Sequence, residues 1–166
     1  AIRRRSALAI GRVRLASGIP ALATALSDSQ MEVRETAAFG LGLIGNQMVV
    51  EPLMEALLDV SPIVQGRAAQ ALGRLGAIEA VDAIQEMVAM HVTEAYDVDP
   101  EEVGYPLTPR VEAFRSGLYA LAMLGSYDAL EATILTEEGD PILWWWPVAH
   151  ALSQVDDSRA VVPLRT

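Results

Sequence analysis

Residues 33–45 read VRETAAFGLGLIG, and residues 64–76 read VQGRAAQALGRLG. The two segments align without a gap at an offset of 31 residues. The same pattern of alanine, leucine and glycine returns 31 residues earlier, around Ile10, and later around Ala120 and Ala151. One spacing is 49 residues instead of 31, and this excess indicates an insertion near residues 92–109. The chain is therefore built from internal repeats, which are typical of stacked architectures.

Each repeat contains two segments with helical periodicity. In the first segment Val33, Ala37, Leu41 and Ile44 recur at i, i+4, i+8 and i+11, which is one face of an α-helix. The second segments repeat this kind of spacing, as in Val50, Leu53 and Leu57 or Val81, Ile84 and Val88. One helix pair cannot bury its apolar face alone, so neighbouring pairs must stack. The sequence predicts an all-α fold, an α/α superhelix of about five antiparallel helix pairs.

We expect a single repeat domain over residues 1–166. Its pairs fall at about residues 1–30, 31–61, 62–91, 110–139 and 140–166, with the irregular insertion at 92–109. Neither end carries the polar cap expected of a terminal repeat, which favours a fragment of a longer protein.

Capping patterns predict where the helices begin and end. A capping residue stands before proline at Ser61-Pro62, Thr108-Pro109 and Asp140-Pro141. Ser29 and Glu32 have the spacing of a capping box. Gly45 and Gly76 occupy positions where a helix end favours left-handed backbone. Glycines inside the predicted helices predict close packing against a neighbouring helix; they are Gly40, Gly42 and Gly73.

Charge and composition exclude several classes of function. The net charge is −10, and residues 35–166 carry twenty acids against six arginines. This argues against a nucleic-acid surface, which needs clustered basic residues. No apolar run approaches the ~20 residues that span a bilayer, so we expect no membrane insertion. Cysteine is absent and no signal-peptide pattern opens the chain. The sequence favours the cytoplasm only slightly, since a signal could precede residue 1.

The motif V-R-x-x-A-A-x-x-L-G-x-I/L-G, clearest in residues 31–61 and 62–91, resembles the HEAT-like repeat first described in phycobilisome lyases. This resemblance implies a bacterial HEAT-repeat domain whose pairs wind into a right-handed superhelix with the second helices on its concave face. Most members of this family bind other proteins, and a few bind chromophore or nucleic acid.

Candidate binding residues lie on the solvent side of the second helices and are acidic: Glu51, Glu55, Asp82, Glu86 and Glu131. By charge complementarity they would suit a basic protein or peptide.

Aromatic residues provide further candidates. Tyr96 and Tyr105 flank an acidic, proline-containing stretch in the insertion, which is either a solvated loop or a contact loop. Asp97, Asp99 and Glu101 alternate as in a calcium loop, but the glycine of such a loop is missing. Three consecutive helical tryptophans cannot all face the core. Trp144 takes the buried register, so Trp145 and Trp146 are candidate contact residues or cover an irregular groove.

No catalytic, cofactor or metal constellation is evident. His91 and His150 are 59 residues apart, without a ligand companion at short spacing, and we expect structural or solvent roles for both. We therefore predict a non-catalytic protein-interaction scaffold. The main alternative is a helper module of a larger enzyme, either a bilin-lyase-like subunit or the helical part of a protein with its catalytic domain elsewhere. DNA binding like that of HEAT-like glycosylases would need a basic groove, and basic residues cluster only in residues 3–14. The oligomeric state stays open.

Overall fold

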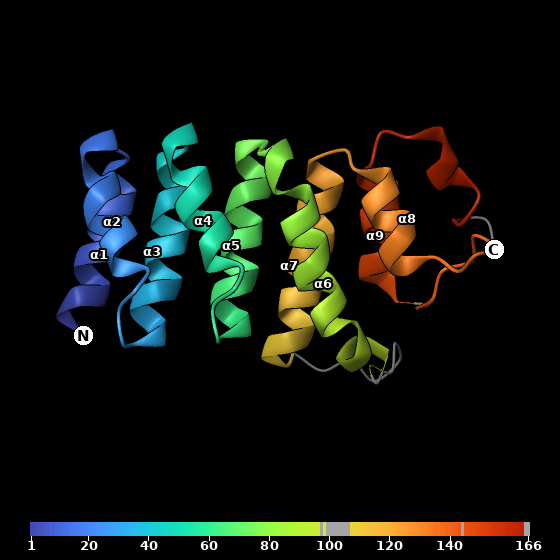
Figure 1. The fold of residues 1–166 in the computed structure, drawn as a ribbon, viewed down its shortest axis with the longest axis horizontal. Coiled ribbons are helices and arrows are strands. Elements are labelled where there is room, and N and C mark those ends of the chain that lie inside the picture. The colour runs from blue at the N-terminus through green and yellow to red at the C-terminus, as the bar shows by residue number, and fades with distance from the viewer. Residues whose placement is uncertain (97, 99–106, 144, 165–166) are drawn as a thin grey trace.

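The computed structural model describes residues 1–96, 98, 107–143 and 145–164. Within them, helices stand side by side along one long axis in two layers, with the N-terminus at one end and the C-terminus at the other (Figure 1). The described residues form no sheet, only an isolated antiparallel bridge between Leu135 and Pro141. The predicted α/α solenoid is confirmed.

The back layer in Figure 1 holds the first helix of each pair, namely α1 (Ile2–Val13), α3 (Met31–Ile44), α5 (Pro62–Leu75), α7 (Pro109–Met123) and α9 (Trp146–Gln154). The predicted starts at Pro62 and Pro109 are confirmed, and Thr108 accepts the capping bond from the Val111 N–H. The predicted left-handed ends at Gly45 and Gly76 are confirmed as well, with φ of 70° and 67°.

The first helices pack backbone against backbone. A Cβ on Gly11 would lie 2.5 Å from the Gly40 Cα in the next first helix, and one on Gly42 would lie 2.7 Å from the Ala71 Cβ. The prediction of close packing at the interior glycines is thus confirmed. Gly73 meets Ala120 in the same way across the insertion, so α5 and α7 continue the stack without a gap.

The front layer holds the second helices α2 (Ile19–Ala25), α4 (Val50–Ala56), α6 (Val81–Tyr96) and α8 (Tyr127–Ile134). Short 3-10 turns lead into the first three of them, at Ala16–Gly18, Gln47–Val49 and Ile78–Ala80. α2, α4 and α6 each pack mainly on the first helix of the next pair. Fully buried leucines such as Leu22 and Leu53 fill these contacts. Because each pair rests on its neighbour in this way, the core runs along the whole stack.

Two predicted helix starts are wrong. The capping box at Ser29 does not form, because α3 begins at Met31 with Gln30 at the N-cap, and the Asp28 side chain accepts the Gln30 N–H at 2.9 Å. The helix expected after Asp140 begins only at Trp146, since backbone bonds such as Ile142 N–H to the Ile134 carbonyl hold residues 135–142 in a turn. Pro147 explains this delay. A helix begun at Pro141 would place it in the interior, whereas in the first turn its missing N–H costs nothing.

α6 runs on to Tyr96, into the stretch assigned to the insertion. The reason is that its buried face continues, with Met87, Val88, His91 and Ala95 all inside. After α9 the chain forms a 3-10 turn at Ser158–Val161, the repeat position at which the first three pairs also place a 3-10 turn before the second helix.

Candidate protein-binding face

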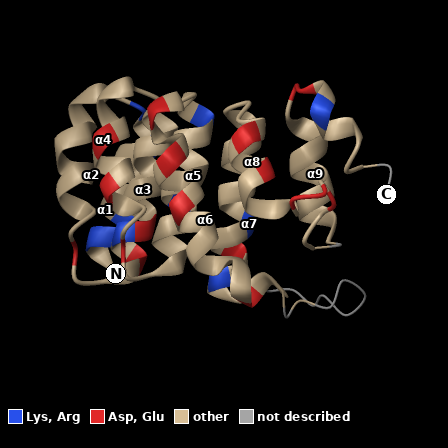
Figure 2. Cartoon of the chain, turned by 45° about the vertical axis from the view of Figure 1, so that its right-hand side comes forward, with Lys and Arg blue, Asp and Glu red and all other residues tan. Residues whose placement is uncertain are grey.

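We use the term second-helix face for the outward surface of α2, α4, α6 and α8. Figure 2 shows acidic residues at several positions along these helices. Glu51 and Glu55 are one helical turn apart on α4, and Asp82 and Glu86 hold the same two positions on α6, 31 residues later. All four side chains are exposed. The repeat therefore places carboxylates in two parallel rows.

These four carboxylates have no ion-pair partner in the part of the chain that the structure describes. Like charges at i and i+4 on a helix cost a few tenths of a kcal/mol per pair. The rows thus slightly destabilise α4 and α6, and the surface presents uncompensated negative charge to solvent.

On α8 the acidic character is weaker. Glu131 is exposed, as the sequence predicts, but the neighbouring Asp128 is paired with Arg159 at 2.8 Å. The Arg159 guanidinium also lies 4.4 Å from the centre of the Tyr127 ring. Burial raises the pKa of the Tyr127 phenol, so this ring stays neutral beneath the ion pair. The two charged rows on α4 and α6 are consequently the more acidic part of the face.

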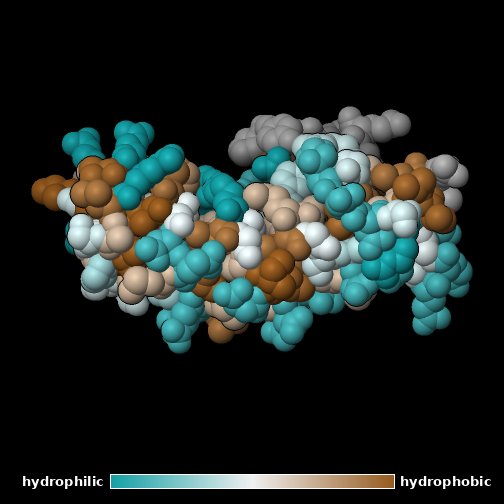
Figure 3. Space-filling view, turned by 90° about the horizontal axis from the view of Figure 1, so that it is seen from above, coloured by the Kyte–Doolittle hydropathy of each residue, from teal (hydrophilic) through white to brown (hydrophobic). Residues whose placement is uncertain are grey.

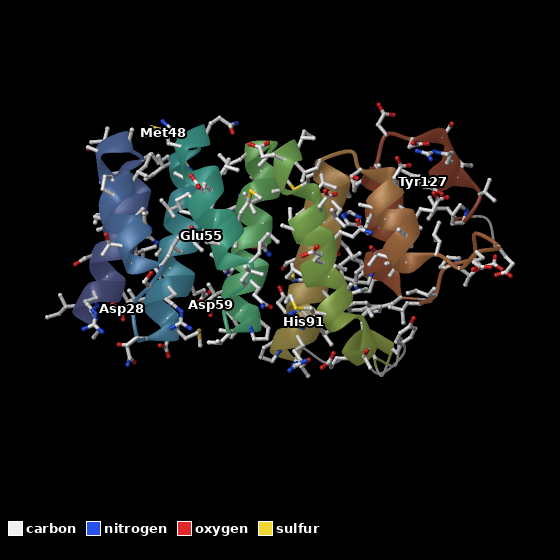
Figure 4. All side chains as sticks on the ribbon, in the orientation of Figure 1. Asp28, Met48, Glu55, Asp59, His91 and Tyr127 are labelled. Carbon is white, nitrogen blue, oxygen red and sulfur yellow. The ribbon has the colours of Figure 1, made fainter. Side chains whose placement is uncertain are left out.

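A groove of about 540 Å³ separates α4 from α6. Met54 and Leu58 line it on the α4 side, and Met87 and Met90 line it on the α6 side. Glu55 lies at its edge and is seen on the front of α4 in Figure 4. The second-helix face therefore combines carboxylates with an apolar depression.

A ladder of ion pairs along one edge of the stack holds the pairs in register. The Arg3 guanidinium donates two bonds to Asp28, at 2.6 and 3.0 Å, and Arg34 donates two to Asp59, at 2.6 and 2.9 Å. Arg34 also donates to the Asp28 carbonyl at 2.9 Å, which ties the second pair to the first. The hydrogen bond from Arg3 lowers the pKa of Asp28, and the bond to Asp59 raises that of Arg34. Sequence reasoning missed this ladder, although the offset of 31 between its members was the signal.

In the third pair the ladder changes its chemistry. Gln65 stands where Arg34 stands one repeat earlier, and it donates to the Asp59 carbonyl at 2.8 Å. Its amide oxygen lies 2.6 Å from Nε2 of His91, one residue after the repeat position of Asp59 (Figure 4). His91 is buried, and this desolvation, with the charge of Arg110, lowers its pKa. The sequence predicts a structural or solvent role for His91, and in the structure its buried site favours the neutral ring.

The tryptophans divide between core and surface. Trp145, a candidate contact residue, is only 3% exposed and stacks on Phe114 at a centroid distance of 6.5 Å, so it is not available to a partner. The turn before α9 directs its ring inward, which the assumed continuous helix did not allow for. Trp146 is 50% exposed and lies near the rings of Tyr119 and His150. Trp144 lies outside the described residues.

The remaining candidates are placed only in part. Tyr96 ends α6 with its side chain exposed, whereas Tyr105 and the acidic positions 97, 99 and 101 lie outside the described residues. In the described part of the chain, no three His, Asp or Glu side chains are grouped to hold a metal ion. No helix within the described ranges has the length and apolar character to cross a membrane.

A stack of repeated helix pairs in which each pair packs on its neighbours defines the class of α-solenoid repeat proteins. The family model for HEAT repeats matches residues 1–59 and 19–95. The chain belongs to the HEAT-repeat family, which confirms the resemblance seen in its sequence.

Two known proteins are similar to this chain. Phycocyanobilin lyase subunit alpha of Picosynechococcus sp. is 32% identical over 103 residues, which cover 62% of this chain and 36% of that protein. A chain in the solved complex of CpcE and CpcF of phycocyanin lyase from Nostoc sp. aligns with a TM-score of 0.65 at 24% identity. That alignment covers 98% of this chain and 56% of the other, and at this identity it shows a shared fold. The chain thus spans about a third of the curated relative and about half of the solved one.

Proposed function

We propose that this chain is a non-catalytic protein-binding module whose second-helix face holds a basic segment of another protein. The observation that supports this most directly is the pair of carboxylate rows on α4 and α6. They recur at the repeat spacing and lack cations within the described residues, although each row costs the helix some stability. A partner that supplies Lys or Arg would remove this repulsion.

Binding of charged peptides tests the proposal. We expect an arginine-rich fluorescent peptide to bind the chain and a glutamate-rich peptide of equal length not to bind, as measured by fluorescence polarisation. Affinity should fall with added salt, because exposed charge pairs are screened over about 8 Å at physiological ionic strength. Equal binding of both peptides would remove the proposal.

A matched pair of variants locates the binding surface. Glu55→Gln with Glu86→Gln removes two charges from the second-helix face, while Glu137→Gln with Glu138→Gln removes two exposed charges from the turn before α9. Both variants have the same net charge. Only the first variant should weaken binding of the basic peptide. Equal weakening by both variants would mean that binding depends on the net charge of the chain and not on the second-helix face.

A second candidate function is that of a bilin-lyase-like helper subunit, or of the helical part of a protein whose catalytic domain lies outside this chain. The identity of 32% with a phycocyanobilin lyase subunit favours it. Since the chain has no cysteine, it offers no thiol of its own for bilin attachment. Visible absorbance of phycocyanobilin tests this candidate. A shift on addition of the chain would support it, and an unchanged spectrum would count against it.

A further inference from the structure

The groove between α4 and α6 has an apolar floor that continues to the surface. Met54 lies on α4 and Leu58 in the turn that follows it, and Met87 and Met90 lie one turn apart on α6. Leu58 is 76% exposed and Met90 is 50% exposed. Large apolar side chains gathered at one depression are a mark of an interaction site more than single scattered ones are. Methionines can also adapt to the shape of what they contact.

The groove stays open because of how its walls are packed. α4 rests mainly on α5, and α6 rests mainly on α7, so the two second helices do not fill the space between them. Its volume of about 540 Å³ lies within the range of ligand-binding clefts, about 300–1,000 Å³. The cavity is thus held open by the first-helix layer.

Carboxylates stand at both sides of this apolar floor. Glu51 and Glu55 line the groove on α4, and Glu86 lines it on α6. In cross-section the surface is acidic, then apolar, then acidic. The complementary shape is an apolar stripe with positive charge on both flanks, which is the cross-section of a basic amphipathic helix.

We propose that this α4–α6 groove binds an amphipathic helix of a partner protein, with Leu- or Met-like residues on its inner face and Lys or Arg on its flanks. The proposal rests on the proposed function and specifies which segment the second-helix face takes. The apolar stretch from Met54 to Leu58 spans about one helical turn, so with its acidic flanks the groove accommodates about two turns, roughly 10 Å, of the bound helix.

Charge and geometry disfavour other occupants. The same groove on a second copy of this chain would bring carboxylates to carboxylates, which is repulsive. An extended peptide alternates its side chains between two opposite faces, so with apolar residues on the groove floor its cations would point to solvent. A helix presents cations to both walls at once.

Designed peptides test the proposal with the full 166-residue chain. The probe is a fluorescein-labelled peptide of about 18 residues with Leu at helical spacing and Arg on the flanks, long enough for some helicity in water. A scrambled peptide of the same composition is its comparator. We expect the patterned peptide to bind at least about tenfold more tightly than the scrambled one, which corresponds to a difference of about 1.4 kcal/mol in binding free energy.

Two surface variants test whether the peptide binds in the α4–α6 groove. Leu58→Ser with Met90→Ser should weaken binding of the patterned peptide at least about tenfold. Met48→Ser with Met123→Ser removes two exposed methionines outside the groove and should leave binding unchanged. All four side chains are exposed, and circular dichroism before titration checks that both variants keep their helices.

The outcomes separate this proposal from the one on which it rests. If basic peptides bind but pattern and groove variants make no difference, the helix-binding groove is refuted and the acidic binding face stands. If no basic peptide binds, both fall. If sedimentation shows a dimer that Leu58→Ser with Met90→Ser dissociates, the occupant is a second copy and the proposal is overturned.

Discussion

Gly42→Ala tests whether the first helices are held together by direct backbone contact. The new Cβ would lie 2.7 Å from the Ala71 Cβ and 3.2 Å from its Cα. Alanine improves helix propensity by about 1 kcal/mol, while overpacking of this kind costs about 1–3 kcal/mol. We therefore expect a net loss of about 1 kcal/mol in the free energy of unfolding. For a chain of this size, that corresponds to a fall in Tm of about 2–4 °C.

A double-mutant cycle isolates the contact. Ala71→Gly alone should cost about 2 kcal/mol, about 1 from helix propensity and about 0.8 from the lost methyl group. In Gly42→Ala with Ala71→Gly the methyl moves from one helix to the other, and the propensity changes cancel. We expect the double variant to be more stable than the sum of the single effects by about 3 kcal/mol, measured by urea unfolding. Additivity within about 0.5 kcal/mol would refute direct contact at this position.

Three further predictions concern the edge of the stack and the end of α1. Arg34→Ala should lower the free energy of unfolding by about 1–3 kcal/mol, because it leaves the nearly buried Asp59 carboxylate without its ion-pair partner. Arg3→Ala should cost less, since the Arg3 side chain is 63% exposed. Chemical denaturation of both variants compares the two losses. The pKa of His91 is lowered in the folded chain, so the unfolded chain takes up the proton first and the free energy of unfolding should decline as pH falls below the ordinary value of 6.5. In His91→Leu the urea midpoint should depend less on pH between about 7.5 and 5.5. The same pH dependence in this variant and the parent chain would contradict the prediction. Arg14 ends α1 in left-handed backbone with φ of 57°, so Arg14→Gly should raise the free energy of unfolding by about 1 kcal/mol, and a lower Tm would argue against strain there.

The sequence predicted the helix pairs well because the features that define them are local and periodic. Apolar residues such as Leu41 and Leu53 recur at helical spacing, and both are fully buried in the core. Gly45 marks a helix end by its own backbone preference, and Pro109 marks a start in the same way. The offset of 31 then converts one correct assignment into several.

Prediction failed where a residue's role depends on its neighbours in space. A continuous helix predicts Trp145 at the surface, yet the turn before α9 directs its ring onto Phe114. His91 is buried against Gln65, a residue 26 positions away, which no helical pattern reveals. The acidic side chains were identified correctly as exposed, but the groove between α4 and α6 depends on how far apart two helices stand. That distance is set by the packing of α5 and α7 beneath them.

The contact between Gly11 and Gly40 has a mechanical consequence for the whole molecule. Where backbones already touch, the distance between neighbouring first helices cannot shorten, so that layer acts as an incompressible spine. Any bending must open or close the spaces on the opposite side, of which the gap between α4 and α6 is one. A segment wedged into that gap would fix the curvature of the stack, and with it the angle at which its two ends face their surroundings.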